Sequence, residues 1–289
     1  MQPATTVHGF YLVHKPVGPS SAAVTNRLKW LLKQSGQPKG IKIGHGSDVA
    51  SEPTEAQSLA CAKVGAAKAP RPPKIKVGHG GTLDPLADGL LPIGVGKATK
   101  QLQTLLEGPK TYTFTLTFGT QTTTDDAVGE ILTTSPHRPT EAELLAVLPQ
   151  FTGPITQTPP AFSALKIEGQ RAYKLARAGA EVVMQPRPVT IHSLKILECQ
   201  PLQSSNPITL QSCLLEAQVS KGTYIRALAR DIAAALGTFG HTTTLTRTHH
   251  GPFSLEQAVS YETLDKALQS GDTHTYLLPL AELPEQSVR

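Results

Sequence analysis

The sequence predicts an α+β fold, with a largely antiparallel mixed sheet flanked by helices. Segments with the two-residue alternation of strands occur in runs along the chain, and segments with helical spacing lie among them. Hydrophobic residues make up 39% of the 289 residues and charged residues 17%, so the chain can bury a sizeable core. We expect a single domain over residues 1–289.

The first ordered region should contain one strand and one helix. An apolar run at residues 9–13 ends at the Lys-Pro and Gly-Pro turns within residues 15–19. Apolar residues then recur at helical spacing over residues 21–33, and Ser20 or Ser21 is placed to cap that helix.

Residues 34–73 are expected to form a flexible basic insertion. Gly, Pro, Ala, Ser and Lys dominate this region, and large apolar residues are few. The stretch from Cys61 to Lys76 holds five basic residues and no acid, within a chain of formal net charge +5. This surplus is compatible with a polyanionic partner.

Two similar glycine-rich segments raise the question of which one is functional. IKIGHGSDVAS starts at Ile41 and IKVGHGGTLDP starts at Ile75, thirty-four positions later. The second segment places Asp84, followed by a proline, five positions after its histidine, whereas the first has Ala50 at the position of that aspartate. We expect the second segment to be functional and the first to be a bystander.

The rest of the chain shows clear strand and helix patterns. Residues 112–118 place aromatic and leucine side chains on one face and threonines on the other. Thr140 and Glu143 form a capping box ahead of one helix, and Gly237 ends another. The expected elements are strands at residues 112–119, 188–199 and 212–220 and helices at residues 138–151, 223–237 and 254–270.

Several classes of protein are disfavoured by missing motifs. Cys61, Cys199 and Cys213 are too few and too scattered for a disulfide framework, which indicates a reducing compartment, the cytoplasm. No secretory signal or membrane-spanning run is present. The histidines and cysteines lack metal-binding spacing, and GVGKAT has Leu91 where a phosphate-binding loop needs glycine.

The segment KVGHGGTLDPLADGLLPIGVG is the best candidate for chemistry. Gly80 and Gly81 permit backbone conformations that other residues resist, and Pro85 biases Asp84 toward an extended conformation. An isolated Asp-Pro pair is more often an Asx-type turn. The length of unusual sequence around this pair favours a functional carboxylate on a constrained loop.

This segment resembles the catalytic motif of the TruB family of pseudouridine synthases, which isomerise the T-loop uridine at position 55 of tRNA. Four more stretches resemble that family in the expected order, and together they cover most of the chain outside the insertion. They are LVHKPVGPSS, KTYTFTLTFGTQTTTDDAVGEI, TPPAFSALKIEGQRAYKLARAG and SKGTYIRALARDI. Five matches in order are specific, whereas one would be weak. The resemblance implies the pseudouridine-synthase catalytic fold.

The resemblance also implies roles for individual residues. Asp84 corresponds to the catalytic aspartate of the family, and Arg226 to the arginine that pairs with it. Tyr112 matches the tyrosine that packs on the target base. The other substrate-binding candidates are Tyr224 of the KGTYIR motif, the loop histidine His79 and the acidic residue Asp126.

The implied reaction suits these residue types. Breaking the glycosidic C–N bond, turning the uracil and rejoining it through carbon needs a carboxylate, but no cofactor and no metal. The base must leave its stack before the enzyme can reach it, and an aromatic face such as that of Tyr112 can hold it there. The sequence leaves open whether Asp84 attacks the sugar C1′ or the uracil C6.

The expected partner is tRNA, bound through its T-arm. About three dozen residues follow Phe253, which is too few for an additional carboxy-terminal RNA-binding module, so we expect a monomeric catalytic domain without one. Two rival functions are an RNA-binding protein that lost catalysis and a guide-dependent synthase of the H/ACA type. The intact Asp84 and Arg226 argue against the first, and the missing module argues against the second.

Overall fold

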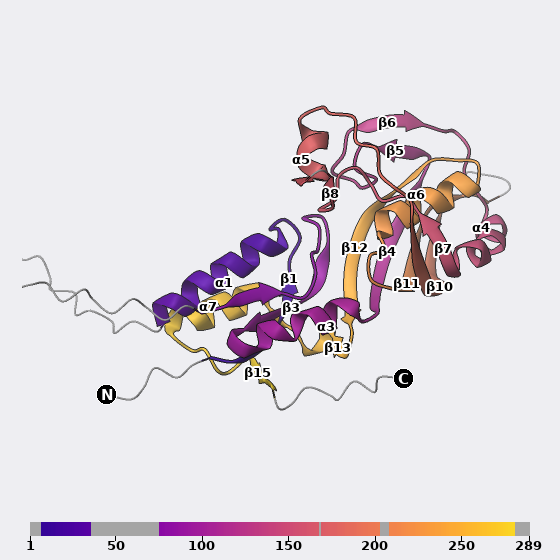
Figure 1. Cartoon of the computed structure of the whole chain (residues 1–289). Helices are drawn as coiled ribbons and strands as arrows, with labels where there is room; N and C mark the ends of the chain where they lie inside the picture. Colours follow the sequence, from indigo (N-terminus) through magenta and orange to yellow (C-terminus); the bar gives the residue numbers. More distant parts are fainter. Residues whose placement is uncertain (1–6, 36–74, 168, 203–207, 281–289) are drawn as a thin grey trace, which may run out of the picture.

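The computed structural model describes residues 7–35, 75–167, 169–202 and 208–280. An eleven-stranded sheet runs through the molecule, and helices pack against it, which confirms the α+β class (Figure 1). The predicted insertion, apart from residues 34 and 35, lies outside the described residues, as does the upstream glycine-rich segment. Among the described helices, none is both long and apolar enough to span a membrane.

The main sheet has the order β14-β1-β3-β12-β4-β11-β10-β7, with β2, β13 and β15 pairing beside this path. Two pairs, β1–β14 and β3–β12, are parallel, and the other pairs are antiparallel. The strands are β1 (Gly9–Lys15), β2 (Val77–His79), β3 (Asp88–Val95), β4 (Lys110–Phe118), β7 (Gly153–Gln157), β10 (Arg187–Pro201), β11 (Leu210–Val219), β12 (Gly240–His250), β13 (Phe253–Ser254), β14 (Val259–Ser260) and β15 (Leu277–Pro279).

Two small hairpins and a set of helices complete the described fold. The hairpins pair β5 (Thr120–Thr122) with β6 (Ile131–Thr134) and β8 (Lys166–Ile167) with β9 (Gln170–Arg171). The α-helices are α1 (Ser21–Ser35), α3 (Leu102–Glu107), α4 (Glu141–Val147), α5 (Ala172–Arg177), α6 (Ile225–Ala235) and α7 (Tyr261–Ser270), and 3-10 turns occupy Gly96–Lys100, Leu148–Phe151 and Leu255–Gln257.

The capping signals are confirmed. The Ser20 hydroxyl accepts a hydrogen bond from the Ala23 amide at 3.1 Å, so Ser20 is the residue that caps α1. Thr140 and Glu143 form the predicted capping box at the start of α4. Strand β4 has the predicted alternation, with every second side chain buried. Local sequence thus determines where these elements begin.

Three features differ from the sequence-based expectations. Residues 254–270 form a 3-10 turn, the short strand β14 and only then α7, because Val259 pairs with Val13 at the edge of the sheet. Strands β3 and β12 were not predicted. The view of the cysteines as scattered was wrong, since the β10–β11 register places Cys199 opposite Cys213, where the two form a disulfide. The cysteines therefore no longer indicate a reducing compartment.

The parallel pairing of β3 with β12 joins two parts of the sheet. On one side, α1 and α7 lie beside β1 and β3, and on the other, α6 lies over β12 and β4 (Figure 1). The larger hydrophobic cluster spans both sides, from Val13 and Leu28 to Phe114 and Ile232. The loop before β3 therefore faces the start of α6 across the middle strands.

Candidate active site

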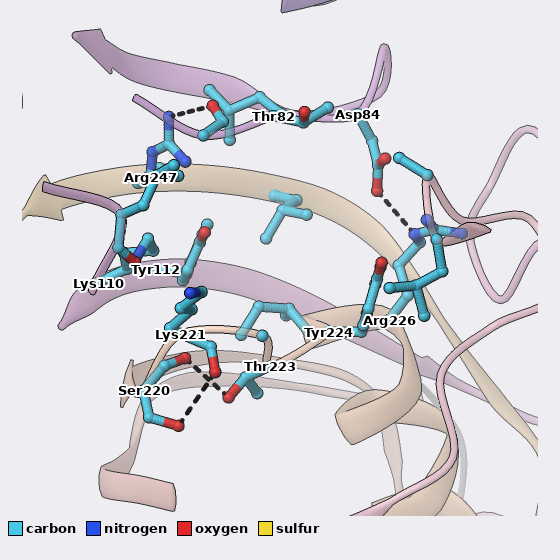
Figure 2. A pocket seen from close by; sticks show the side chains of 18 of the residues that line it. Thr82, Asp84, Lys110, Tyr112, Ser220, Lys221, Thr223, Tyr224, Arg226 and Arg247 are labelled. Atoms are coloured by element: carbon cyan, nitrogen blue, oxygen red, sulfur yellow. Dashed lines mark hydrogen bonds and ion pairs between the residues drawn. The ribbon is translucent and has the colours of Figure 1, made fainter. Parts of the chain in front are cut away.

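A cavity of about 350 Å³ opens between the loop that precedes β3 and the segment that joins β11 to α6. Figure 2 shows Asp84 on the first of these, Tyr224 on the second, Arg226 in the first turn of α6, and Tyr112 of β4 on the wall between. Other lining residues are Thr82, Leu83, Leu106, Lys110, Leu165, Arg187, Lys221, Thr223, Leu245 and Arg247.

The loop that carries Asp84 is held by α1. The buried Ser21 hydroxyl accepts a hydrogen bond from the Leu83 amide at 2.8 Å and lies 3.1 Å from the Leu83 carbonyl, to which it donates. Gly81 has φ +125°, a conformation that favours glycine. These restraints leave the Asp84 side chain 33% exposed, so its carboxylate is accessible from the cavity.

Arg226 connects Asp84 to the rest of the site. Its guanidinium is 3% exposed, and its Nε donates to Asp84 Oδ2 at 2.8 Å. Its two terminal nitrogens donate to the carbonyls of Thr124 at 2.7 Å and Phe162 at 3.0 Å. Because three directions of the planar group are occupied, the guanidinium has one orientation, and Asp84 is fixed with it.

Asp126 lies behind this pair and does not line the cavity. Its Oδ2 is 3.7 Å from Arg226 Nε, and its Oδ1 accepts hydrogen bonds from the Thr124 hydroxyl at 2.5 Å and the Val128 amide at 3.0 Å. The side chain is 8% exposed. Asp126 is therefore placed to support Arg226 and the Thr124 turn.

The two tyrosines occupy different supports. Tyr112 is 8% exposed on β4, between Ala217 of β11 and Arg247 of β12. Tyr224 precedes α6, and its ring lies under the Arg187 guanidinium, with 5.0 Å from the guanidinium carbon to the ring centroid. Tyr112 thus belongs to the sheet, whereas Tyr224 belongs to the segment before α6 and has its ring against Arg187 of β10.

The Tyr224 backbone is clamped by a fully buried side chain. Gln157, the last residue of β7, accepts a hydrogen bond from the Tyr224 amide at 2.8 Å and donates one to the Tyr224 carbonyl at 3.1 Å. Sequence reasoning missed Gln157. It lies just before the quoted stretch TPPAFSALKIEGQRAYKLARAG, which was the only available signal.

Three cations gather at the end of the cavity away from Asp84 and were also missed. Lys110 and Lys221 occur in stretches that resemble the TruB family, whereas nothing in the sequence singles out Arg247. Burial, followed by the Arg247 charge, lowers the pKa of Lys110 to about 8. Figure 2 shows Lys110 and Arg247 close together, with Tyr112 between them and the Asp84 end.

His79 is a second predicted site residue that lies outside the cavity lining. It lies on β2, paired with Ile93, and is half-buried rather than part of the cavity wall. Burial, and then the Arg247 charge, lower the pKa of His79, so the ring is neutral near pH 7. The cavity therefore brings together Asp84, Tyr112, Tyr224 and Arg226 but neither His79 nor Asp126.

Two family models match the chain from residue 69 to residue 283 and leave β1 and α1 outside. A family model described as the TruB family pseudouridylate synthase N-terminal domain matches residues 69–225, and one described as the tRNA pseudouridylate synthase B C-terminal domain matches residues 226–283. The boundary falls within the first turn of α6, and β12 beyond it pairs with β4 before it. The expected single domain is consistent with this shared sheet and stays a prediction.

Three similar proteins of known name are all called tRNA pseudouridine synthase B. A tRNA pseudouridine synthase B from Gluconobacter oxydans is 39% identical over 92% of this chain and 66% of its own length. Proteins of the same name from Novosphingobium aromaticivorans and Cereibacter sphaeroides are 50% and 38% identical, over 72% and 96% of this chain and 67% and 78% of their own lengths. The chain thus spans about two thirds of the first two relatives.

Solved structures show the same fold. A Cbf5-Nop10-Gar1 complex matches with a TM-score of 0.56 and 25% identity, over 90% of this chain and 54% of the matched chain. A H/ACA ribonucleoprotein bound to a substrate RNA matches with a TM-score of 0.57 at 22% identity, over 93% of this chain and 57% of that one.

Proposed function

The chain belongs to the TruB family of pseudouridylate synthases, and we propose that it isomerises uridine to pseudouridine at position 55 in the T-loop of cytoplasmic tRNA. The observation that carries this proposal is the Asp84–Arg226 pair, at 2.8 Å, in a cavity that also presents Tyr112 and Tyr224. That set of side chains matches the chemistry of a glycosidic rearrangement on a base that has left its stack.

Each residue of the pair has a separate task in this proposal. If Asp84 attacks the sugar C1′, the N1–C1′ bond breaks and the uracil leaves as an anion, and its C5 then attacks C1′ and displaces Asp84. If Asp84 instead adds to the uracil C6, the N1–C1′ bond breaks after the addition, C5 bonds to C1′, and Asp84 leaves C6. In both cases C5 loses its proton and N1 gains one. Arg226 holds the attacking oxygen in place through a charge-assisted hydrogen bond. The reaction uses these protein groups and needs neither a redox cofactor nor a metal ion.

Of the remaining site residues, all except Asp126 bind the substrate. Tyr112 supplies a face on which the flipped uracil stacks, and Tyr224 supports the nucleotide from the start of α6. Asp126 acts through Arg226, 3.7 Å away, rather than through the substrate. His79 contacts the RNA beside the cavity, from its half-buried position on β2.

A test of this function uses the purified chain and an unmodified tRNA transcript, with pseudouridine mapped by position after incubation. We expect conversion at position 55. Asp84→Asn should abolish it while tRNA affinity stays within several-fold of wild type, because phosphate contacts supply most of the affinity. Asp265→Asn on α7 removes a carboxylate outside the cavity and is the matched control. Turnover near wild type in Asp84→Asn would contradict the role of Asp84.

A guide-dependent synthase is a second candidate, which the likeness to the Cbf5 complex favours. The two functions differ in what the reaction requires. A synthase that selects its own substrate converts the transcript without any other RNA or protein. If conversion appears only when a guide RNA and partner proteins are added, the second candidate is correct.

A further inference from the structure

We propose that Lys110 and Arg247 form a subsite for one phosphodiester of the substrate RNA, next to the nucleotide that enters the cavity. The inference rests on the proposed function, because it assigns that substrate's backbone to one end of the same cavity. It concerns the end away from Asp84, where Lys110 of β4 and Arg247 of the neighbouring strand β12 both line the cavity (Figure 2).

Arg247 is a buried cation without an acidic partner in the described structure. It is 1% exposed, and its Nε donates to the Leu90 carbonyl at 2.8 Å and its Nη2 to the Gly81 carbonyl at 3.3 Å. None of the salt bridges among the described residues includes it. Carbonyls orient a guanidinium but do not neutralise it, so the buried charge lacks a counterion.

Lys110 repeats this pattern beside Arg247. It is 8% exposed, and its Nζ donates to the carbonyls of Leu106 at 2.9 Å and Gly108 at 2.7 Å, near the end of α3. An ammonium group has three donors, and these bonds use two of them. Within the described part of the chain Lys110 also has no ion pair. One donor is thus left for a ligand in the cavity.

No carboxylate near this end of the cavity is free to neutralise Lys110 and Arg247 among the described residues. The adjacent carboxylate, Glu107, is 55% exposed and already pairs with Lys221. Asp84 is bound to Arg226 at the opposite end. A phosphodiester oxygen between Lys110 and Arg247 would accept charge-assisted hydrogen bonds from both and complete the network.

The position also suits a nucleotide in the cavity. Arg247 is the cross-strand partner of Tyr112, and Lys110 is two residues before Tyr112 on β4. If the base stacks at Tyr112 and the sugar faces Asp84, the adjoining phosphate of the RNA strand lies near Lys110 and Arg247. The subsite would therefore fix the register of the strand, while Asp84 and Arg226 act on the nucleotide.

The first test measures binding to T-arm hairpins in which single phosphates are replaced by neutral methylphosphonates. Full-length Asp84→Asn protein is used, so affinity is read without turnover, and failure of the proposed reaction does not obscure the result. We expect one position adjacent to the target uridine to weaken binding about 10-fold, the scale of a hydrogen bond to a charged group. Equal effects at every position would overturn the proposal.

A double-mutant cycle assigns the contact to this subsite. Adding Lys110→Met should weaken binding to native RNA by a similar factor but should not weaken binding to the sensitive methylphosphonate further. It should also lower the slope of log Kd against log salt by about 0.7–1, the value of one phosphate contact. Lys266→Met on α7 removes an exposed lysine outside the cavity as a control. Additive effects in the cycle would overturn the assignment.

The pH dependence of binding supplies a second readout. The pKa of Lys110 is lowered to about 8, and the charged or titratable groups that face it are Arg247 and His250 on β12, Glu107 on α3 and Lys221. Affinity should fall between pH 7 and 9 as Lys110 loses its proton, and this fall should be absent in Lys110→Met. A fall that persists in the variant would contradict the subsite.

Inorganic phosphate could bind the same two cations as the RNA phosphodiester, and a competition experiment distinguishes the two ligands. We expect millimolar phosphate to reduce RNA binding no more than sodium chloride of equal ionic strength. If phosphate competes specifically while every methylphosphonate hairpin binds as well as native RNA, the cations bind a free anion, and the proposal is overturned.

Discussion

Replacement of Gln157 by leucine tests whether the backbone clamp on Tyr224 supports the site. Leucine has a similar size but neither donor nor acceptor, so Gln157→Leu removes the hydrogen bonds of 2.8 Å and 3.1 Å to the Tyr224 amide and carbonyl. Gln157 is fully buried, so water does not replace its amide. The segment that holds Tyr224 and Arg226 would lose its link to β7.

The magnitude follows from the two backbone groups that lose a partner. A buried polar group without a hydrogen bond costs about 1–3 kcal/mol, and the half-buried position of Tyr224 favours the lower half of that range. We expect Gln157→Leu to lower the free energy of unfolding by about 2–4 kcal/mol. We also expect a kcat about 10- to 100-fold lower, because displaced reacting groups are costly.

Urea unfolding and single-turnover assays on the tRNA transcript measure the two effects. Gln218→Leu is the matched control, because Gln218 is exposed on β11, and it should stay within about 0.5 kcal/mol of wild type. Tyr224→Phe separates the clamp from the hydroxyl, since it keeps the backbone bonds. If Gln157→Leu matches Gln218→Leu in both stability and kcat, the clamp has no role in the site.

Other predictions test the roles of single side chains. Tyr112→Phe should fold normally but have a low kcat, and Tyr112→Ala should also lose base stacking. A wild-type kcat in Tyr112→Phe would show that the hydroxyl has no role and that Tyr112 only stacks on the base. The pKa of His250 is lowered from 6.5 to about 2, mainly by burial, so its contribution to stability is present above pH 6.5 and is lost below it. Between pH 7.5 and 5, urea unfolding of wild type should lose about 2 kcal/mol more than that of His250→Gln, and equal losses would refute this. His45→Ala with Asp48→Asn, outside the described residues, should leave kcat unchanged, and a collapse would identify the upstream segment as functional.

The sequence predicted the parts of the site that depend on local patterns. The alternation of residues 112–118 places Tyr112 on the buried face of β4, and the helix pattern after Tyr224 places Arg226 in the first turn of α6. The contact between Arg226 and Asp84 came from the resemblance to a family, since the two residues are far apart in the chain. Their roles in the reaction stay predictions.

The contribution of β12 to the site could not be predicted from the sequence, for a physical reason. Its register against β4 shifts between Thr242 and Thr244 and again between Arg247 and His249, so its side chains do not keep a two-residue period. Alternation is the main sequence signal of a strand, and each shift interrupts it. Irregular strands are therefore hard to predict, even when they carry site residues.

Contact between β12 and β3 depends on a glycine whose partner strand is distant in sequence. Gly89 has φ +101°, and a Cβ at this residue would lie 2.4 Å from the Arg247 carbonyl oxygen. Only a residue without a side chain lets the two backbones approach so closely, and this approach places the Arg247 side chain against the Leu90 and Gly81 carbonyls. The sequence shows that residue 89 is glycine, but it does not show which strand packs against this glycine. That information exists only in the folded chain.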